Sequence, residues 1–232
     1  IELPMPNGEM QKFSVVESSM MHENLAQKFP AIKSYLGQGL DDRTSTLRMT
    51  IDHNGFHAMI ISVSGTVYID PYSLNNTEYC ITYYKEDFYA TNTKKRASQC
   101  IVDESLSDLL PRNRASGQSG DILRTYRTAM SAAGEYTAFH GGSVEDGLAA
   151  INVTISRVNS VFEREASIRL ILVENNDLII YTDAASDPYS GNTAAMLGQN
   201  QNAVDDVIGN SNYDIGHVVG TTAGGIASSG SV

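Results

Sequence analysis

A stripe of apolar residues at helical spacing is the feature that most constrains the fold of this chain. The stripe consists of Val144, Leu148, Ile151, Ile155, Val158 and Phe162, at alternating spacings of four and three. This spacing predicts one face of a helix about twenty residues long. Ser143 begins the helix, and Asp146 completes a capping box in which Asp replaces the preferred Glu or Gln. We expect the apolar face to pack against a sheet that Leu123–Met130 opens.

Short branched or alternating segments surround this helix. They predict the strands Leu123–Met130, Ile168–Val173, Leu178–Tyr181 and Tyr213–Val219, and a weaker second helix at Asn192–Ile208. The resulting order is β-α-β-β-α-β, which implies right-handed crossovers. Residues 121–232 are therefore expected to form an α/β lobe with a twisted mixed sheet.

The first half of the chain alternates with the period of a strand instead. The predicted strands are Leu47–Ile51, His57–Val63, Thr66–Ile69 and Tyr79–Tyr84, with turns at Asp52–Gly55 and Ser64–Gly65. Branched and aromatic residues suit an antiparallel meander of this kind. One helical segment is expected at Ser19–Tyr35, where Pro30 must end or kink it. Residues 1–110 thus read as an α+β domain that is mainly antiparallel β.

Residues 111–120 separate the two patterns. Their sequence is Pro-Arg-Asn-Arg-Ala-Ser-Gly-Gln-Ser-Gly, which has no apolar periodicity. This composition predicts an exposed linker. Arg112 and Arg114 offer basic cleavage points within it.

Charge and hydropathy argue against two classes of partner. Sixteen basic and twenty-seven acidic residues give a net charge of −11, so nucleic acid would be repelled. The longest apolar stretches, such as Ala58–Val63 and Ile168–Val173, are far shorter than the ~20 residues of a membrane helix. No Lys or Arg follows Arg169, while seven acidic residues do. That imbalance suits a secreted surface, calcium, or simply a solvated acidic face.

The residues that usually carry hydrolase chemistry form no complete set. His22-Glu23 begins like a zinc-binding His-Glu-x-x-His helix, but position 26 is Ala. The sequence contains no Gly-x-Ser-x-Gly elbow, Walker loop or Cys-x-x-Cys pair. The two cysteines, Cys80 and Cys100, either form one disulfide or remain free thiols.

Longer motifs distinguish the second half of the chain. They are Leu123-Arg-Thr-Tyr-Arg-Thr-Ala129, Gly134-Glu-Tyr-Thr-Ala-Phe-His-Gly-Gly142, Ile179-Ile-Tyr-Thr-Asp183, Asp187-Pro-Tyr189 and Tyr213-Asp-Ile-Gly-His-Val-Val219. In combination, residues 119–232 resemble the start of the catalytic domain of bacterial reprolysin-like zinc metalloproteases, which are metzincins. The first half resembles the propeptide of the same enzymes at Leu3–Gly8, Gly55–Ile60, Tyr68–Tyr72 and Tyr83–Lys85.

The resemblance implies a fragment of a secreted or periplasmic zymogen. The family's His-Glu-x-x-His helix would follow Gly224–Val232, where this sequence ends, so the zinc ligands are expected elsewhere. The implied parent is a zinc endopeptidase, with upper-subdomain architecture in residues 121–232. Its implied partners are a protein or peptide substrate and the remainder of the catalytic domain. We assign no catalytic or metal-ligating residue, and expect His140 and His217 to be turn and strand residues.

Two segments receive roles from this resemblance. The metzincin edge strand binds substrate as an added strand, and by position it would include Gly224, Gly225, Ile226, Ala227 and Ser228. The same residues also read as a plain flexible loop. Cys100 precedes the linker, and its thiolate would hold the zinc of the zymogen in a latent state. A disulfide to Cys80 or simple packing are the alternatives.

A function of a different class also fits the sequence. In it, a β-rich inhibitory or adhesion module is joined to an α/β lobe that only binds. Sequence beyond Val232 would separate the two hypotheses, because a His-Glu-x-x-His helix is expected only in the protease.

Overall fold

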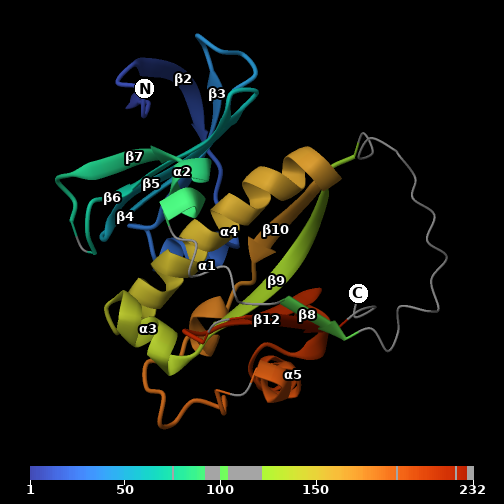
Figure 1. The fold of residues 1–232 in the computed structure, drawn as a ribbon. Helices are drawn as coiled ribbons and strands as arrows, with labels where there is room; N and C mark the ends of the chain where they lie inside the picture. The colour runs from blue at the N-terminus through green and yellow to red at the C-terminus, as the bar shows by residue number, and fades with distance from the viewer. Residues whose placement is uncertain (75, 92–99, 104–121, 192, 223, 229–232) are drawn as a thin grey trace.

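Seven consecutive strands form one antiparallel sheet in the N-terminal lobe (Figure 1). The computed structural model describes residues 1–74, 76–91, 100–103, 122–191, 193–222 and 224–228. The strands are β1 (Glu2–Pro4), β2 (Met10–Glu17), β3 (Lys33–Gly39), β4 (Thr46–Asp52), β5 (Gly55–Ser62), β6 (Gly65–Pro71) and β7 (Cys80–Tyr84). Each pairs with the next strand in sequence, and the short helix α2 (Lys85–Thr91) follows. The predicted meander is confirmed.

The N-terminal lobe has a core of its own. Phe13, Leu47, Ile60 and Ile69 are each at most 2% exposed and pack together on one face of the sheet. Alternation places these side chains on the same side of neighbouring strands. This core contains only residues of the N-terminal lobe.

The region before β4 differs from the prediction. A helical segment was expected at Ser19–Tyr35, ended or kinked by Pro30; α1 does end before Pro30 but covers only Glu23–Lys28, and β1 to β3 were not predicted. His22 begins α1, because its Nδ1 accepts a hydrogen bond from the backbone N–H of Asn24. After Pro30 the chain turns into β3, which pairs with both β2 and β4. Long-range strand pairing therefore overrides the local helical composition.

Three parallel strands form the sheet of the C-terminal lobe. β9 (Arg124–Ala132) lies in the centre between β10 (Ile168–Leu172) and β11 (Ile215–Val219). The helices are α3 (Gly134–His140), α4 (Val144–Ala166) and α5 (Thr193–Val207). A separate two-stranded pair consists of β8 (Cys100–Asp103) and β12 (Gly225–Ser228), which are also parallel. The expectation of a mixed sheet is therefore wrong for the described residues.

The long helix α4 follows the sequence prediction closely. Ser143 Oγ accepts from the backbone N–H of Asp146 at 3.1 Å, and the Asp146 carboxylate accepts from the backbone N–H of Ser143 at 3.0 Å. Within the stripe, Leu148, Ile151 and Ile155 are buried against the parallel sheet. The opposite side of α4 contacts β4 and β5, so the helix lies between the two sheets (Figure 1).

The predicted strand Leu178–Tyr181 is a short 3₁₀ helix instead. This helix, η3, covers Asn176–Ile179. The buried side chain of Asn176 accepts from the Met130 N–H at 2.7 Å and donates to the Met130 carbonyl at 3.0 Å. Its amide group thus takes the backbone partners that a neighbouring strand would use. Only Ile180 continues as an isolated bridge, to Ala132.

Two further predictions concern the linker and membrane insertion. The proposed linker 111–120 lies outside the described residues. Among the described helices, none has the length and apolar character needed to cross a membrane.

Candidate functional site

Two of the longer sequence motifs meet at the start of α3. The backbone N–H of Gly134 donates to Asp187 Oδ2 at 2.7 Å. A Cβ at position 134 would lie only 2.2 Å from the backbone nitrogen of Ala184, so glycine is required there. Tyr181 and Tyr189 stack edge to face on the same loop, with ring centroids 5.7 Å apart. These motif residues therefore dock the loop after β10 against α3.

The turn between α3 and α4 joins a third motif to the N-terminal lobe. Gly141 ends α3 with a φ of 136°, a conformation that favours glycine. Beyond the turn, the Asp146 carboxylate accepts from Ser143 and lies 2.7 Å from Nε2 of His53, which belongs to the N-terminal lobe. Burial alone would raise the pKa of Asp146, but these contacts hold it at about 2. Asp146 remains ionised and serves both the cap and the interface.

The predicted substrate edge forms a strand that is already paired. Gly225, Ile226 and Ala227 lie in β12, opposite Cys100, Ile101 and Val102 of β8, and Ser228 lies opposite Asp103. Gly224 precedes the strand with a φ of 111°. β12 also contacts α5 (Figure 1). The structure thus brings together the two segments to which the sequence assigned substrate binding and latency.

The cysteines have different positions in this arrangement. Cys80 begins β7 and is an exposed free thiol. Cys100 begins β8, and its backbone pairs with Gly225, while its side chain lies outside the description. The structure therefore separates Cys80 from the predicted substrate edge and places the Cys100 backbone on it.

A cleft of about 430 Å³ lies between the N-terminal sheet and helices α3 and α4. Its polar centre is Asp70, which accepts hydrogen bonds from His57 and Tyr83 at 2.7 Å and from Arg157 at 2.5 Å. Burial opposes ionisation, but these donors lower the pKa of Asp70 to about 2. His140 also lines the cleft and stacks on Tyr136 at 4.5 Å. Both oxygens of Asp70 accept hydrogen bonds, and because Arg157 belongs to α4, the cluster includes a contact between the two lobes.

The histidines do not converge on a metal site. His22 caps α1, His140 ends α3, and His217 is an exposed residue of β11. Within the described ranges, no three His, Cys, Asp or Glu side chains are grouped so that they could hold a metal ion. The described residues therefore do not fit a zinc or calcium centre.

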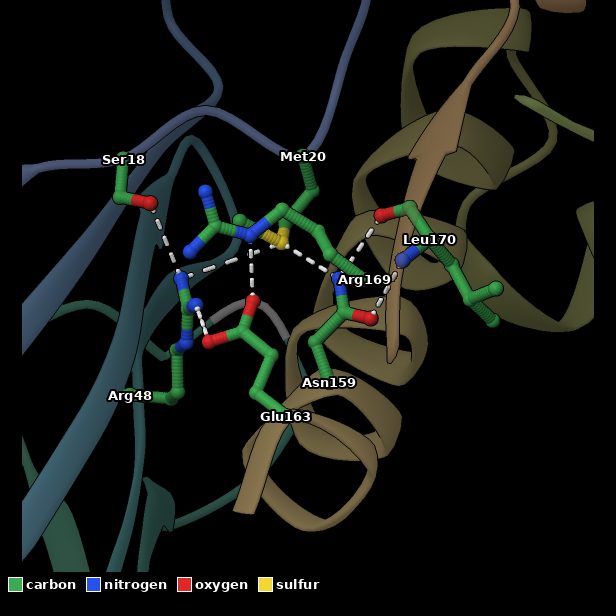
Figure 2. Close-up of polar contacts among 7 residues, drawn as sticks. All are labelled: Ser18, Met20, Arg48, Asn159, Glu163, Arg169 and Leu170. Carbon is green, nitrogen blue, oxygen red and sulfur yellow. Dashed lines mark hydrogen bonds and ion pairs between the residues drawn. The ribbon is translucent and has the colours of Figure 1, made fainter. Parts of the chain in front are cut away.

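Sequence reasoning missed a buried ion-pair network between the lobes (Figure 2). Arg48 of β4 is 2% exposed and pairs with Glu163 of α4. Glu163 also accepts from Arg169 of β10 at 2.5 Å. Burial lowers the pKa of Arg48, while the charge of Glu163 raises it. The sequence contained a signal, since Arg48 alternates with Leu47 and Met49 and so points away from the N-terminal core.

Comparison with known proteins finds a match between the second lobe and a peptidase family. Residues 122–231 match the family model described as Metallo-peptidase family M12B Reprolysin-like. No curated protein matches the chain. The resemblance found in the motifs of the second half is thus confirmed for the C-terminal lobe.

Proposed function

From the match of residues 122–231 to the reprolysin-like metallopeptidase family, we propose that this chain is part of a secreted zinc-endopeptidase zymogen. Residues 1–110 would be the propeptide, and residues 121–232 the upper part of the catalytic domain. The family match, the parallel sheet and the capped helix α4 support the second assignment. The antiparallel lobe packed against α4 supports the first.

The observation that carries this proposal is the pairing of β8 with β12. An extended substrate binds a protease edge by adding a strand, so it needs free N–H and C=O groups along that edge. In this chain Cys100–Asp103 takes up one edge of Gly225–Ser228. A peptide cannot use the same hydrogen bonds while β8 is present. The proposed propeptide therefore blocks the proposed substrate strand directly.

The proposed zinc site requires ligands from another part of the enzyme. The described residues do not fit the metal, so we assign them no step of peptide hydrolysis. Their proposed contribution is to bind and align the substrate backbone at β12 and to keep that edge covered before maturation.

Zinc analysis and a peptidase assay test this division of roles. We expect the purified 232-residue chain to bind no stoichiometric zinc and to cleave no casein. A protein extended past Val232 should gain a His-Glu-x-x-His segment within about fifty residues, together with both properties. An extended reading frame without that segment would instead support the inhibitory or adhesion module. One chelator-sensitive zinc in the present chain, with casein cleavage, would contradict the proposal.

Cys100 gives a sharper test of latency in the complete proenzyme. A thiolate from Cys100 would occupy the zinc position that the attacking water needs. Cys100→Ser should therefore raise activity before linker cleavage, whereas the matched variant Cys80→Ser should not. Equal effects of the two substitutions would argue for a shared structural role and against zinc ligation.

A further inference from the structure

The segment between β2 and β3 leaves the N-terminal sheet and joins the sheet of the other lobe. The backbone N–H of Leu172 donates to the Met20 carbonyl at 2.8 Å, and the N–H of His22 donates to the Leu172 carbonyl at 2.9 Å. Met21 and Leu172 form a parallel bridge. Residues 20–22 therefore cover the edge of β10 that faces away from β9 and β11.

The same segment fills part of the C-terminal core. Met20, Met21, Leu25 and Ile32 are at most 5% exposed, and they contribute four of the thirteen buried residues of that cluster. They share the cluster with Leu148, Ile151 and Ile155 of the α4 stripe and with Leu172. If the N-terminal lobe left, these apolar side chains would meet water. Such exposure strongly opposes separation of the lobes.

Polar contacts also connect the two lobes beside this segment (Figure 2). The Asn159 side chain donates to the Leu170 carbonyl and accepts from its N–H, both at 2.8 Å, and its amide nitrogen also lies 2.9 Å from the Met20 sulfur. Arg48 donates to Ser18 Oγ at 3.1 Å and pairs with Glu163. Separation would leave the buried guanidinium of Arg48 without its carboxylate.

We propose that the N-terminal lobe stays bound as a noncovalent subunit of the C-terminal lobe after the chain is cut within residues 111–120. The anchor is the segment Met20–Ile32 together with Arg48. The inference rests on the maturation cleavage of the proposed function, but it goes further. The anchor lies on β10, whereas β8 covers β12. Uncovering the substrate edge and losing the N-terminal lobe are therefore separate events.

The test uses the full chain with a recognition sequence for a site-specific protease in place of residues 112–118. The purified protein is cut with that protease and passed over a gel-filtration column at about 1 µM, where a nanomolar pair stays together. We expect both pieces to elute as one species with the mass of the intact chain. Because the cut is made by an added enzyme, the result does not depend on whether the parent protein is a peptidase. Separate elution of the two pieces would overturn the proposal.

Anchor variants show whether the named contacts hold the pieces together. Leu25→Ala and Arg48→Met should each raise the dissociation constant of the cut pair at least tenfold. Arg43→Met is the matched control on an exposed loop of the same lobe and should leave it within about twofold. Circular dichroism of the uncut variants establishes that they are folded, and the two anchor variants test the junction independently. If both bind as tightly as the Arg43→Met protein, the anchor is wrong.

Discussion

The two lobes bury their cores in different ways. The N-terminal core consists of residues from its own strands, and every strand of that sheet pairs with its neighbour in sequence. The larger of the two buried clusters in the C-terminal lobe takes four of its thirteen residues from the segment Met20–Ile32, more than ninety positions before β9, whereas the smaller one contains only residues of that lobe. A meander of local pairs can close around itself, whereas the parallel lobe is completed by a segment from outside it. The C-terminal lobe therefore depends on the N-terminal lobe to complete the larger of its two cores.

The largest expected effect tests the α4 stripe on which the C-terminal core is built. Ile155→Asp would place an unpaired carboxylate at a site that is 2% exposed, and should lower the free energy of unfolding by roughly 4 kcal/mol. Phe162 belongs to the same stripe but is 43% exposed, so Phe162→Asp should cost less than about 1 kcal/mol. Urea unfolding measures both. An Ile155→Asp protein as stable as the Phe162→Asp protein would show that the stripe is not a core face.

The next prediction compares two leucines with the same burial. Leu25 and Leu47 are both 0% exposed. Leu25 lies in the core that the segment Met20–Ile32 shares with the C-terminal lobe, whereas Leu47 lies in the N-terminal core. Replacement of either by Ala should cost about 2–5 kcal/mol. Hydrogen exchange should separate them, because Leu25→Ala should lower protection in α4 and β10, and Leu47→Ala in β4 and β5. Identical exchange patterns would remove the distinction between the lobes.

Local signals in the sequence predicted the elements that depend on local energetics. The stripe and the cap residue Ser143 were sufficient for α4, since its first turn is closed by contacts three residues apart. Alternation and glycine turns were sufficient for β4 to β6. Helical composition failed around β3, whose pairing with β2 and β4 is long-range.

The candidate site was predicted only by family resemblance. Nothing in the local pattern of Cys100–Asp103 indicates that it pairs with Gly225–Ser228, more than a hundred residues later. The role of Asn176 is also not predicted from the sequence, because its two hydrogen bonds to Met130 exist only when β9 is in place. Likewise, the alternation in β4 shows on which face of the strand Arg48 lies, but it does not identify Glu163 as the partner of Arg48.

A smaller expected effect concerns the loss of stability at low pH that the Asp70 cluster between the lobes should cause. The pKa of Asp70 is held at about 2, and the same carboxyl should have its usual value of about 3.9 when unfolded. A depressed pKa stabilises the fold above pH ~4, and this contribution, roughly 2 kcal/mol, is lost as the pH falls toward 2. Unfolding measured between pH 5 and pH 2 should therefore show a shallower acid loss for Asp70→Asn than for the unmodified protein. Glu78→Gln, at an exposed position, is the control and should retain the full acid dependence.

The smallest expected effect compares a surface ion pair that joins the two lobes with a surface ion pair inside the N-terminal lobe. Lys28 pairs with Asp177 across the lobes at 3.1 Å, while Lys33 pairs with Glu17 inside the N-terminal lobe at 2.9 Å. Both lysine side chains are 42% exposed, so Lys28→Ala and Lys33→Ala should each lower stability only slightly at low salt. In the cut protein, however, only Lys28→Ala should weaken the association of the two pieces and reduce its dependence on salt. Because the two lysines match in exposure, equal effects on association would mean that the Lys28 contact contributes nothing specific to the junction, and the apolar anchor at Met20–Ile32 would then carry the attachment without it.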